Sequence, residues 1–290
     1  MAGKKTVLVT GATTGIGREI ALHLAGLGHR VFATGRNEGA LESLVEESGD
    51  KALETFRLDV NDPQSITSAR AEVDEKTEGY GLDVLVNNAG FGNMAPIEMV
   101  SDADMRGQFE TNVFGLVKVS QAFMPAMRKR GSGKIIQISS VVGRLTLPLQ
   151  GVYCATKHAV ESISDALRME AAPFGVHVSI VEPGTIRSRF EEKVTSTISS
   201  YKTPDSPYSP AIGKYRETVG KAYKKAASPA CIARTVAKIV RKRRPKARYV
   251  SPWFNKLAIF FARLVPTRWF DFGMRKAMGL DKKLLDKPGE

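Results

Sequence analysis

The chain has 290 residues, of which 42% are hydrophobic and 25% are charged, and this globular composition excludes a disordered tail protein or a fibre. The net charge of +13 is unevenly distributed. Residues 1–190 contain 20 basic and 22 acidic side chains, whereas residues 191–290 contain 23 and 8. The C-terminal third is therefore expected to face a different partner from the rest of the chain.

The two cysteines, Cys154 and Cys231, are too few for a disulfide framework and fit a reducing compartment. The longest apolar run near the C-terminal end, at 257–262, has six residues. A membrane span needs roughly 18 to 20. The apolar stretch at 6–10 is too short for the core of a signal peptide. We expect a cytoplasmic protein.

Short apolar, β-branched segments alternate with segments of helical spacing along the chain. The predicted strands lie at 6–10, 30–34, 53–58, 82–87, 134–139 and 176–181, with a late strand at 248–251. Apolar residues recur at helical steps in 16–27 and 160–171, and a further helix is expected over 232–240. This alternation predicts an α/β fold with a doubly wound parallel sheet, the Rossmann fold. The polar, proline-rich stretch at 195–210 is predicted to be a mobile loop.

A glycine motif follows the first predicted strand and opens the first predicted helix. Gly11, Gly15 and Gly17 are spaced G-x-x-x-G-x-G. Such glycines allow a tight turn, a close approach to a pyrophosphate and close helix packing, and the helix N-terminus attracts negative charge. An ordinary strand-to-helix turn is the alternative for this motif taken alone. The predicted dinucleotide-binding residues here are Gly11, Thr13, Thr14, Gly15, Ile16 and Gly17.

Arg36 follows the second predicted strand, where an acidic residue would bind the ribose 2′-hydroxyl of NAD(H). A guanidinium suits a 2′-phosphate instead, and the next carboxylate is Glu38. We therefore expect NADP(H) to be preferred over NAD(H). The alternative is that Arg36 is a solvated loop charge.

Tyr153 and Lys157 lie four residues apart in a predicted helix and therefore share one face. A neighbouring cation favours the phenolate of a tyrosine, whose ordinary pKa is roughly 10. Reduction of a carbonyl needs a hydride at carbon and a proton at oxygen, and Tyr153 can donate that proton. Ser140, at the end of the fifth predicted strand, can hydrogen-bond the same oxygen. The pair alone is also typical of an ordinary helix face.

Taken together, these motifs resemble the short-chain dehydrogenase/reductase family over roughly residues 5 to 250. The branch most similar contains 17β-hydroxysteroid and retinol dehydrogenases and acyl-dihydroxyacetone-phosphate reductases. The resemblance implies the catalytic set Asn112, Ser140, Tyr153 and Lys157. It adds to the cofactor site Asp59, Val60, Asn88, Ala89, Gly90, Pro183, Gly184 and Thr185, together with Tyr153 and Lys157.

The resemblance also implies individual roles. Asp59 and Val60 would contact the adenine, and Thr185 the nicotinamide amide. Lys157 would bind the nicotinamide ribose, and Asn112 would shape its helix to hold a water in a proton relay. Family members commonly form homodimers through the long helices that carry Asn112 and Tyr153, so a homodimer is expected.

The expected activity is NADPH-dependent, reversible reduction of a lipophilic ketone or aldehyde. The segment at 141–149, which would wall the substrate pocket, is chiefly apolar. We expect a catalytic and dinucleotide-binding domain at 1–252, a lid at about 185–228 and a basic, aromatic extension at 253–290. The four histidines have neither metal spacing nor an acidic partner, so no metal is assigned.

The extension suggests contact with an anionic membrane surface. On a helical wheel, residues 253–265 give an apolar arc from Phe260 round to Ala258, with Arg263 opposite and Ile259 outside the arc. Trp, Phe and basic residues suit an anionic membrane, as does the basic cluster at 241–248. The alternative is that the aromatic residues cover the pocket or the sheet. Pro266 is expected to separate a second short helix.

A different class of function is a membrane-associated dinucleotide-binding adaptor, or an RNA-binding protein, without turnover. The basic end favours phosphate contact in general. No recognised nucleic-acid motif accompanies it, and nucleic acid is not expected as a partner. The complete catalytic set would also have no use in such a protein.

Overall fold

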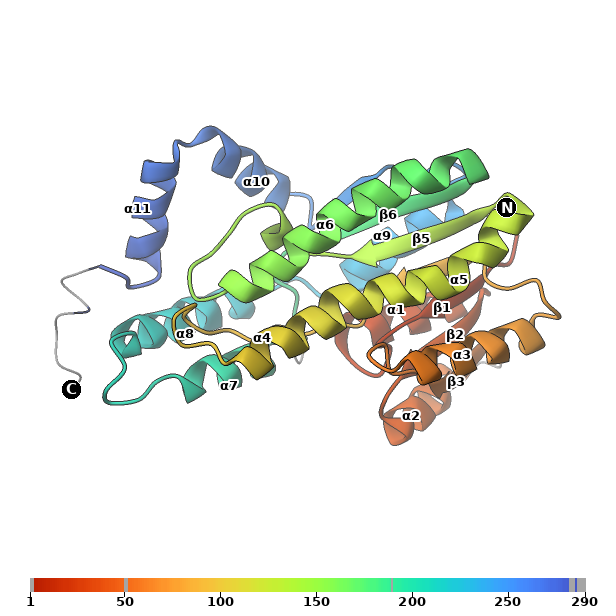
Figure 1. Ribbon diagram of the computed structural model, residues 1–290, viewed down its shortest axis with the longest axis horizontal. Coiled ribbons are helices and arrows are strands. Elements are labelled where there is room, and N and C mark those ends of the chain that lie inside the picture. Colours follow the sequence, from red (N-terminus) through yellow and green to blue (C-terminus); the bar gives the residue numbers. More distant parts are fainter. Residues whose placement is uncertain (1–2, 50–51, 189, 282–284, 286–290) are drawn as a thin grey trace.

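The computed structural model describes residues 3–49, 52–188, 190–281 and 285, and its centre is a seven-stranded parallel sheet (Figure 1). The spatial order is β3-β2-β1-β4-β5-β6-β7. The strands are β1 (Thr6–Val9), β2 (Arg30–Gly35), β3 (Leu53–Arg57), β4 (Val84–Asn87), β5 (Gly133–Ile138), β6 (Val176–Pro183) and β7 (Arg248–Ser251). The predicted doubly wound sheet is confirmed, including its late strand.

Helices cover both faces of the sheet, which is why its strands lack strict polar alternation. On one face α1 (Gly15–Gly26), α2 (Glu38–Ser48) and α9 (Ala230–Arg241) pack over alternate residues such as Val7 and Val9. On the other, α3 (Pro63–Lys76), α5 (Leu116–Arg130) and α6 (Gly151–Ala171) cover the sheet, and the first two pack over Leu8 and Phe32. These six helices and the sheet between them form one α/β domain with two hydrophobic layers.

The order of the strands reverses between β1 and β4. Chain connections leave the sheet in opposite directions there, which opens a crevice at the carboxyl ends of the strands. The chain after β4 reaches α4 (Asp102–Phe109) and a π-helical segment (Glu110–Gly115) that leads directly into α5. The crevice is therefore bordered by the ends of the strands and by these helices.

The prediction of a mobile loop over the whole of 195–210 is wrong at both ends, whereas residues 201–208 lie outside any helix or strand. The segment 195–200 belongs to α7 (Phe190–Ser200), and α8 (Ser209–Lys224) begins within the last two residues. Val194 and Ile198, four residues apart, are buried on one face of α7. The polar side chains turn back onto the helix, as when the Ser199 hydroxyl donates to the Thr195 carbonyl at 2.5 Å. The composition predicts a loop because the many hydroxyl residues outnumber the two apolar residues of the buried face.

The chain after β7 forms two helices, α10 (Asn255–Leu264) and α11 (Thr267–Ala277), with Pro266 between them as predicted. The alternative that their aromatic residues cover the pocket or the sheet is wrong, because Phe260, Phe261 and Trp269 are exposed. No helix among the described residues is both long enough and apolar enough to span a membrane.

Candidate active site

A cleft of about 1110 Å³ opens at the carboxyl edge of the sheet, at the point where the strand order reverses. It brings together residues from the whole length of the catalytic core. The predicted site residues that line it are Gly11, Thr13, Thr14, Gly15, Ile16, Arg36, Asp59, Val60, Asn88, Ala89, Gly90, Ser140, Tyr153, Lys157, Pro183, Gly184 and Thr185. Of the residues expected at the site, Gly17 and Asn112 lie behind the cleft wall.

The glycine turn needs its glycines for separate reasons. Gly11 and Gly15 have φ angles of +64° and +57°, in the left-handed region that favours glycine. A Cβ at Gly11 would lie 2.8 Å from the Cα of Ala89. A Cβ at Gly17 would collide with the Gly11 carbonyl and the Asn88 side chain. Gly17 therefore allows the close packing of α1 against the turn and does not itself line the cleft.

The N-terminus of α1 is suited to an anion. Its N-cap, Thr14, makes no side-chain capping hydrogen bond, and the first turn contains no acidic residue. By contrast, Asn37 caps α2 by accepting from the Ala40 amide at 2.9 Å. An uncapped helix start leaves N–H groups that favour a negatively charged group such as a diphosphate. This part of the cleft therefore fits the phosphates of a dinucleotide.

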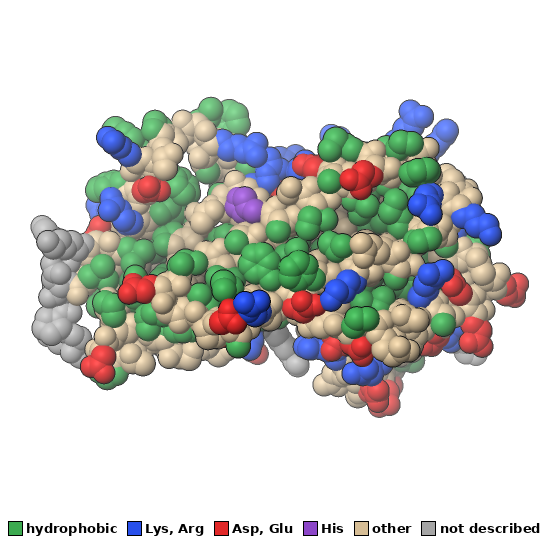
Figure 2. All heavy atoms as spheres, in the orientation of Figure 1, with side chains coloured by type: hydrophobic (Ala, Val, Ile, Leu, Met, Phe, Trp, Pro, Cys, Tyr) green, Lys and Arg blue, Asp and Glu red, His purple; other side chains and the backbone are tan. Residues whose placement is uncertain are grey.

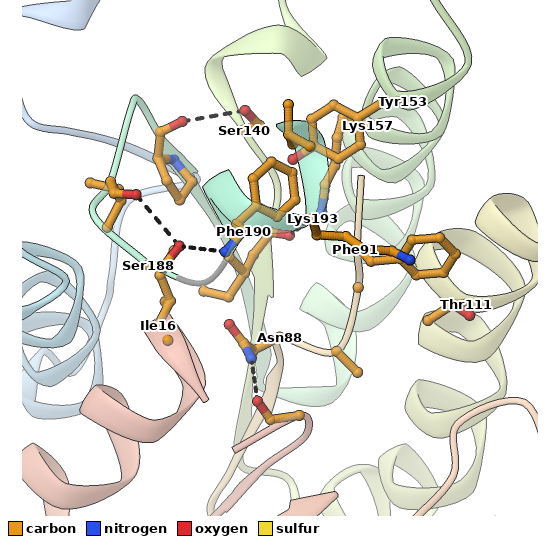
Figure 3. Close-up of a pocket in the computed structure, with 18 of the residues that line it drawn as sticks. Ile16, Asn88, Phe91, Thr111, Ser140, Tyr153, Lys157, Ser188, Phe190 and Lys193 are labelled. Carbon is orange, nitrogen blue, oxygen red and sulfur yellow. Dashed lines mark hydrogen bonds between the residues drawn. The ribbon is translucent and has the colours of Figure 1, made fainter. Parts of the chain in front are cut away.

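Thr10 holds the glycine turn to the end of β4, a role that the sequence did not predict. Its hydroxyl accepts hydrogen bonds from the backbone amides of Asn88 and Ala89, each at 3.0 Å. The Asn88 side-chain amide donates two bonds, to the carbonyls of Thr10 and Gly11, both at 3.0 Å, and one of them is drawn in Figure 3. A buried Thr before a glycine motif could have been noted as a turn-forming residue, but its partners are 78 and 79 positions away.

Arg36 lies at the end of β2, exposed to solvent and on the wall of the cleft. Gly35 and Asn37 flank it there. A Cβ at Gly35 would lie 2.6 Å from the Thr13 methyl group, so the end of β2 and the glycine turn are in close contact. The guanidinium can therefore reach a group bound beside this turn.

Tyr153 and Lys157 lie side by side on α6, and Ser140 faces them from the end of β5 (Figure 3). The Lys157 ammonium is 5.9 Å from the centroid of the Tyr153 ring and donates to the Ile138 carbonyl at 2.9 Å. Ser140 donates to the Pro183 carbonyl at 3.4 Å. The hydroxyl of Ser140, from the end of β5, therefore meets the phenol and the ammonium of α6 at one end of the cleft.

Burial determines the protonation of these groups. It raises the pKa of Tyr153, and a hydrogen bond with Ser140 acts in the opposite direction. Burial lowers the pKa of Lys157 to about 8, although the Glu161 carboxylate favours the charged form. From the sequence we expected Lys157 to lower the pKa of Tyr153, but desolvation is the larger effect here. Tyr153 is therefore a phenol near neutral pH, the form that can donate a proton.

Asn112 lies in the π-helical segment between α4 and α5. Its amide donates to the Phe91 carbonyl at 2.8 Å and to the Thr156 hydroxyl at 3.1 Å. Its side-chain oxygen accepts from the Phe91 amide at 2.9 Å. Asn112 therefore fixes the chain after Gly90 to the helix that carries Tyr153. Local π-helical geometry is frequent at functional sites.

Comparison with known proteins identifies the family. The model of the family described as short chain dehydrogenase matches residues 5–199. The chain is a short-chain dehydrogenase. It is 40% identical over 201 residues to human 17-beta-hydroxysteroid dehydrogenase type 1, covering 66% of this chain and 60% of that protein. It is 33% identical over 260 residues to retinol dehydrogenase 8 of Bos taurus, covering 84% of this chain and 80% of that protein.

A solved structure shares the fold. The closed form of serine dehydrogenase complexed with NADP+ superposes with a TM-score of 0.72 and 30% sequence identity, covering 84% of this chain and 93% of that one. Both the family and its hydroxysteroid and retinol dehydrogenase branch, expected from the motifs, are confirmed. The chain is an oxidoreductase of a family that binds NAD(P) and acts on small molecules.

This short-chain dehydrogenase also has a covering segment over the catalytic end of the cleft. The chain leaves β6, forms α7 and α8, and returns to pair with its own start, since Arg187 donates to the Ala227 carbonyl at 2.9 Å. Phe190 of α7 packs on Tyr153 with ring centroids 5.5 Å apart (Figure 3). Residues that the sequence did not predict also line the cleft. They come from this segment and from the residue directly after α11: Phe190, Lys193, Tyr215, Tyr223 and Met278.

Proposed function

We propose that the protein is an NADP(H)-dependent reductase that converts a lipophilic ketone or aldehyde to an alcohol, reversibly. The observation that carries this proposal is the meeting of Ser140, Tyr153 and Lys157 in the same cleft as the glycine turn. The uncapped start of α1 and the left-handed glycines fit the phosphates of a dinucleotide. When bound, NADPH would supply the hydride to the carbonyl carbon.

The residues of the chain supply the rest of the reaction. The Tyr153 hydroxyl donates its proton to the carbonyl oxygen as that oxygen gains negative charge. Ser140, beside it, hydrogen-bonds the same oxygen and holds it in line. Lys157 places a positive charge near the tyrosine ring and is fixed by the Ile138 carbonyl. In the oxidative direction, the phenolate form of Tyr153 would take the proton from the alcohol oxygen.

Preference for NADP(H) over NAD(H) is supported by Arg36 on the cleft wall, where its neighbours Gly35 and Asn37 are not acidic. A guanidinium can bind a 2′-phosphate with two charge-assisted hydrogen bonds. Its hydrogen bond with an uncharged ribose hydroxyl is weaker. A relative in fold, serine dehydrogenase, is complexed with NADP+.

A lipophilic substrate is supported by the walls around Tyr153. They include Val142, Leu147 and Phe190, and Val194 and Val219 from the covering segment. Such walls favour an apolar molecule with one carbonyl over a sugar or a charged acid. We propose that residues 185–228 act as a lid over this substrate, since α7 and α8 reach the cleft from a narrow base.

We also propose a homodimer, as is common in the family, and a cytoplasmic location. Both cysteines, Cys154 and Cys231, are free thiols, in keeping with a reducing compartment.

Replacement of the catalytic phenol tests the proposal. Tyr153→Phe is expected to lower kcat by about 10²- to 10⁴-fold, because it removes the proton donor and keeps the ring. NADPH binding, followed by fluorescence, should be unchanged. The substrates would be steroid, retinoid, acyl-ketone and quinone carbonyls, with NADPH oxidation read at its absorbance band. The matched control is Tyr249→Phe, a tyrosine on β7 outside the cleft.

Two results would contradict this function. A fully active Tyr153→Phe variant would exclude Tyr153 as the acid. Tight NADPH binding with no turnover of any carbonyl class by the unmodified protein would instead favour the dinucleotide-binding adaptor.

A further inference from the structure

The two C-terminal helices, α10 and α11, form an arm beside the catalytic end of the molecule (Figure 1). The structure describes every residue of both helices. Ile259 is the one buried residue of α10, and α11 has none. The arm therefore contributes little to the core of the domain, and its side chains face outward.

These outward side chains are unusually apolar. The described residues include seventeen large exposed hydrophobic side chains, and nine of them lie at 253–272, in the arm or in the residues directly before it. They are Trp253, Phe254, Leu257, Phe260, Phe261, Leu264, Val265, Trp269 and Phe272. Single exposed apolar residues are common, but a concentration of this kind marks a surface that binds another molecule or a membrane.

The orientation of α10 makes this exposure informative. The helix contacts the domain through its more polar side, where Ile259 is buried and Asn255 lies against Gly184. The aromatic arc with Phe260 and Phe261 points away. Because a helix that only covered the sheet would bury its apolar face, the reversed orientation indicates that the aromatic face has another contact.

The charges of the arm indicate which contact. Its exposed basic residues are Lys256, Arg263, Arg268, Arg275 and Lys276, against the single acidic residue Asp271. Figure 2 shows basic and hydrophobic side chains next to one another on this arm. A second copy of the chain would place the same positive surface against itself, which is unfavourable. An anionic bilayer surface complements it, because basic residues close to such a surface are attracted to its lipid headgroups.

The basic cluster at 241–248, which the sequence also suggested for a membrane, belongs elsewhere. It precedes β7, whereas the arm follows that strand, so the two lie at opposite ends of β7. Arg248 is directed inward, onto Glu161 at 3.0 Å and Glu182 at 3.3 Å. The arm is therefore the surface to test.

The arm is joined to the substrate end of the cleft. Met278, one residue past α11, is buried and lines the cleft, and Leu280 packs against the same apolar cluster as Tyr153 and Phe190. A bilayer held by the arm would thus lie close to the lid and the apolar wall. That consequence rests on the proposed function, whereas the docking itself does not.

We propose that α10 and α11 dock the protein on an anionic membrane surface, with their aromatic face in the headgroup region and their basic residues on lipid phosphates and carboxylates. Trp and Phe favour this depth, and a pair of short helices lying in the interface needs no membrane-spanning segment. The lipophilic substrate would then reach the cleft from the bilayer.

Vesicle flotation of the full chain tests the docking. The vesicles contain phosphatidylcholine alone or phosphatidylcholine with phosphatidylserine. The unmodified chain should float with the second kind and much less with the first. The double variant Phe260→Ser, Trp269→Ser should bind the anionic vesicles at least about tenfold more weakly, because it removes two large aromatic side chains from the face that enters the headgroup region. The double variant Arg263→Glu, Lys276→Glu should lose the preference for phosphatidylserine.

The matched control is Leu27→Ser, Met169→Ser, which removes two exposed apolar side chains of 55% and 63% exposure outside the arm. Its flotation should equal that of the unmodified chain. Absence of flotation in the unmodified chain, or equal flotation of the arm variants, would overturn the proposal. So would a self-association in solution that the arm variants abolish, since the face would then bind a second copy. Turnover of a soluble ketone without vesicles is measured in parallel. If the unmodified chain shows no turnover but floats as expected, the proposed function is contradicted and the docking is not.

Discussion

At the scale of single residues, we expect the protonation of Lys157 to control the pH range of the proposed reaction. Burial lowers its pKa to about 8, and the Glu161 carboxylate, one helical turn away, favours the charged form. Lys157 is therefore an ammonium below about pH 8 and loses its charge above it. The pKa of Tyr153 is raised, so that the tyrosine is still a phenol in that range. The rate of carbonyl reduction should accordingly fall as pH rises past about 8.

Glu161→Gln tests this assignment. Removal of the carboxylate removes the interaction that favours the ammonium, so the alkaline limb of the kcat profile should move to lower pH, by an amount on the order of half a unit to one unit. Asp165→Asn is the control, because Asp165 also binds Arg248 but lies one turn further from Lys157. An unmoved limb in Glu161→Gln would mean that another group titrates there.

The proposed preference for NADP(H) depends on Arg36. Arg36→Gln removes the guanidinium and keeps a polar side chain at an exposed position. The KM for NADPH should rise about tenfold or more, since a charged hydrogen bond contributes roughly 1.5–3 kcal/mol. The KM for NADH, which lacks the 2′-phosphate, should stay the same. Arg70→Gln, an exposed arginine on α3, serves as control. Equal KM changes for both cofactors would show that Arg36 does not read the phosphate.

At the scale of elements, a set of buried charges ties four parts of the structure together behind the catalytic residues. Arg144, after the turn that follows Ser140, donates to Glu182 at the end of β6 at 3.0 Å. Arg248 of β7 contacts Glu182 at 3.3 Å and Glu161 of α6 at 3.0 Å. Glu182 is 1% exposed, and burial raises its pKa while both arginines lower it. These contacts hold the segment after Ser140 against β6.

Arg144→Met should therefore destabilise the protein by about 3 kcal/mol, because it leaves a buried carboxylate with one partner fewer. The unfolding midpoint in urea measures the effect. Arg168→Met is the matched control: Arg168 pairs with the partly exposed Asp165, and a loss below about 1 kcal/mol is expected. Equal losses in the two variants would mean that the buried contact of Arg144 with Glu182 contributes no more to the free energy of unfolding than a partly exposed ion pair.

The same elements show which parts of the structure can be predicted from the sequence. The strands follow from local β-branched runs, such as Val176 to Val181, and the glycine motif and the Tyr153–Lys157 pair follow from spacing along one element. The contact of Arg248 with Glu161 joins residues 87 positions apart, and no local pattern encodes it. Helix α7 was missed because its apolar stripe has only Val194 and Ile198. The orientation of α10 could not be predicted from the sequence either, because its contacts with the domain bury Ile259 and leave the apolar arc of the helical wheel exposed.

At the scale of the whole molecule, two apolar surfaces of the described residues differ in charge, and the arm is the first of them. The second lies at the junction of α4 and α5, where Met105 and Phe114 are 38% and 50% exposed beside a shallow hollow. Its charges are paired on the same chain, with Arg106 on Asp102 at 2.7 Å and Lys118 on Glu110 at 2.5 Å. This surface can therefore meet a second copy without the repulsion that the basic arm would cause.

Phe114→Asp should convert the proposed homodimer to a monomer, because it places two carboxylates opposite each other across a two-fold contact in the position of two apolar rings. Sedimentation velocity measures the mass directly. The arm variant Phe260→Ser, Trp269→Ser is the control, and it should keep the dimer while losing vesicle binding. If the arm variant dissociates and Phe114→Asp does not, the dimer forms through the arm, and the aromatic face of α10 is then occupied by protein and closed to lipid.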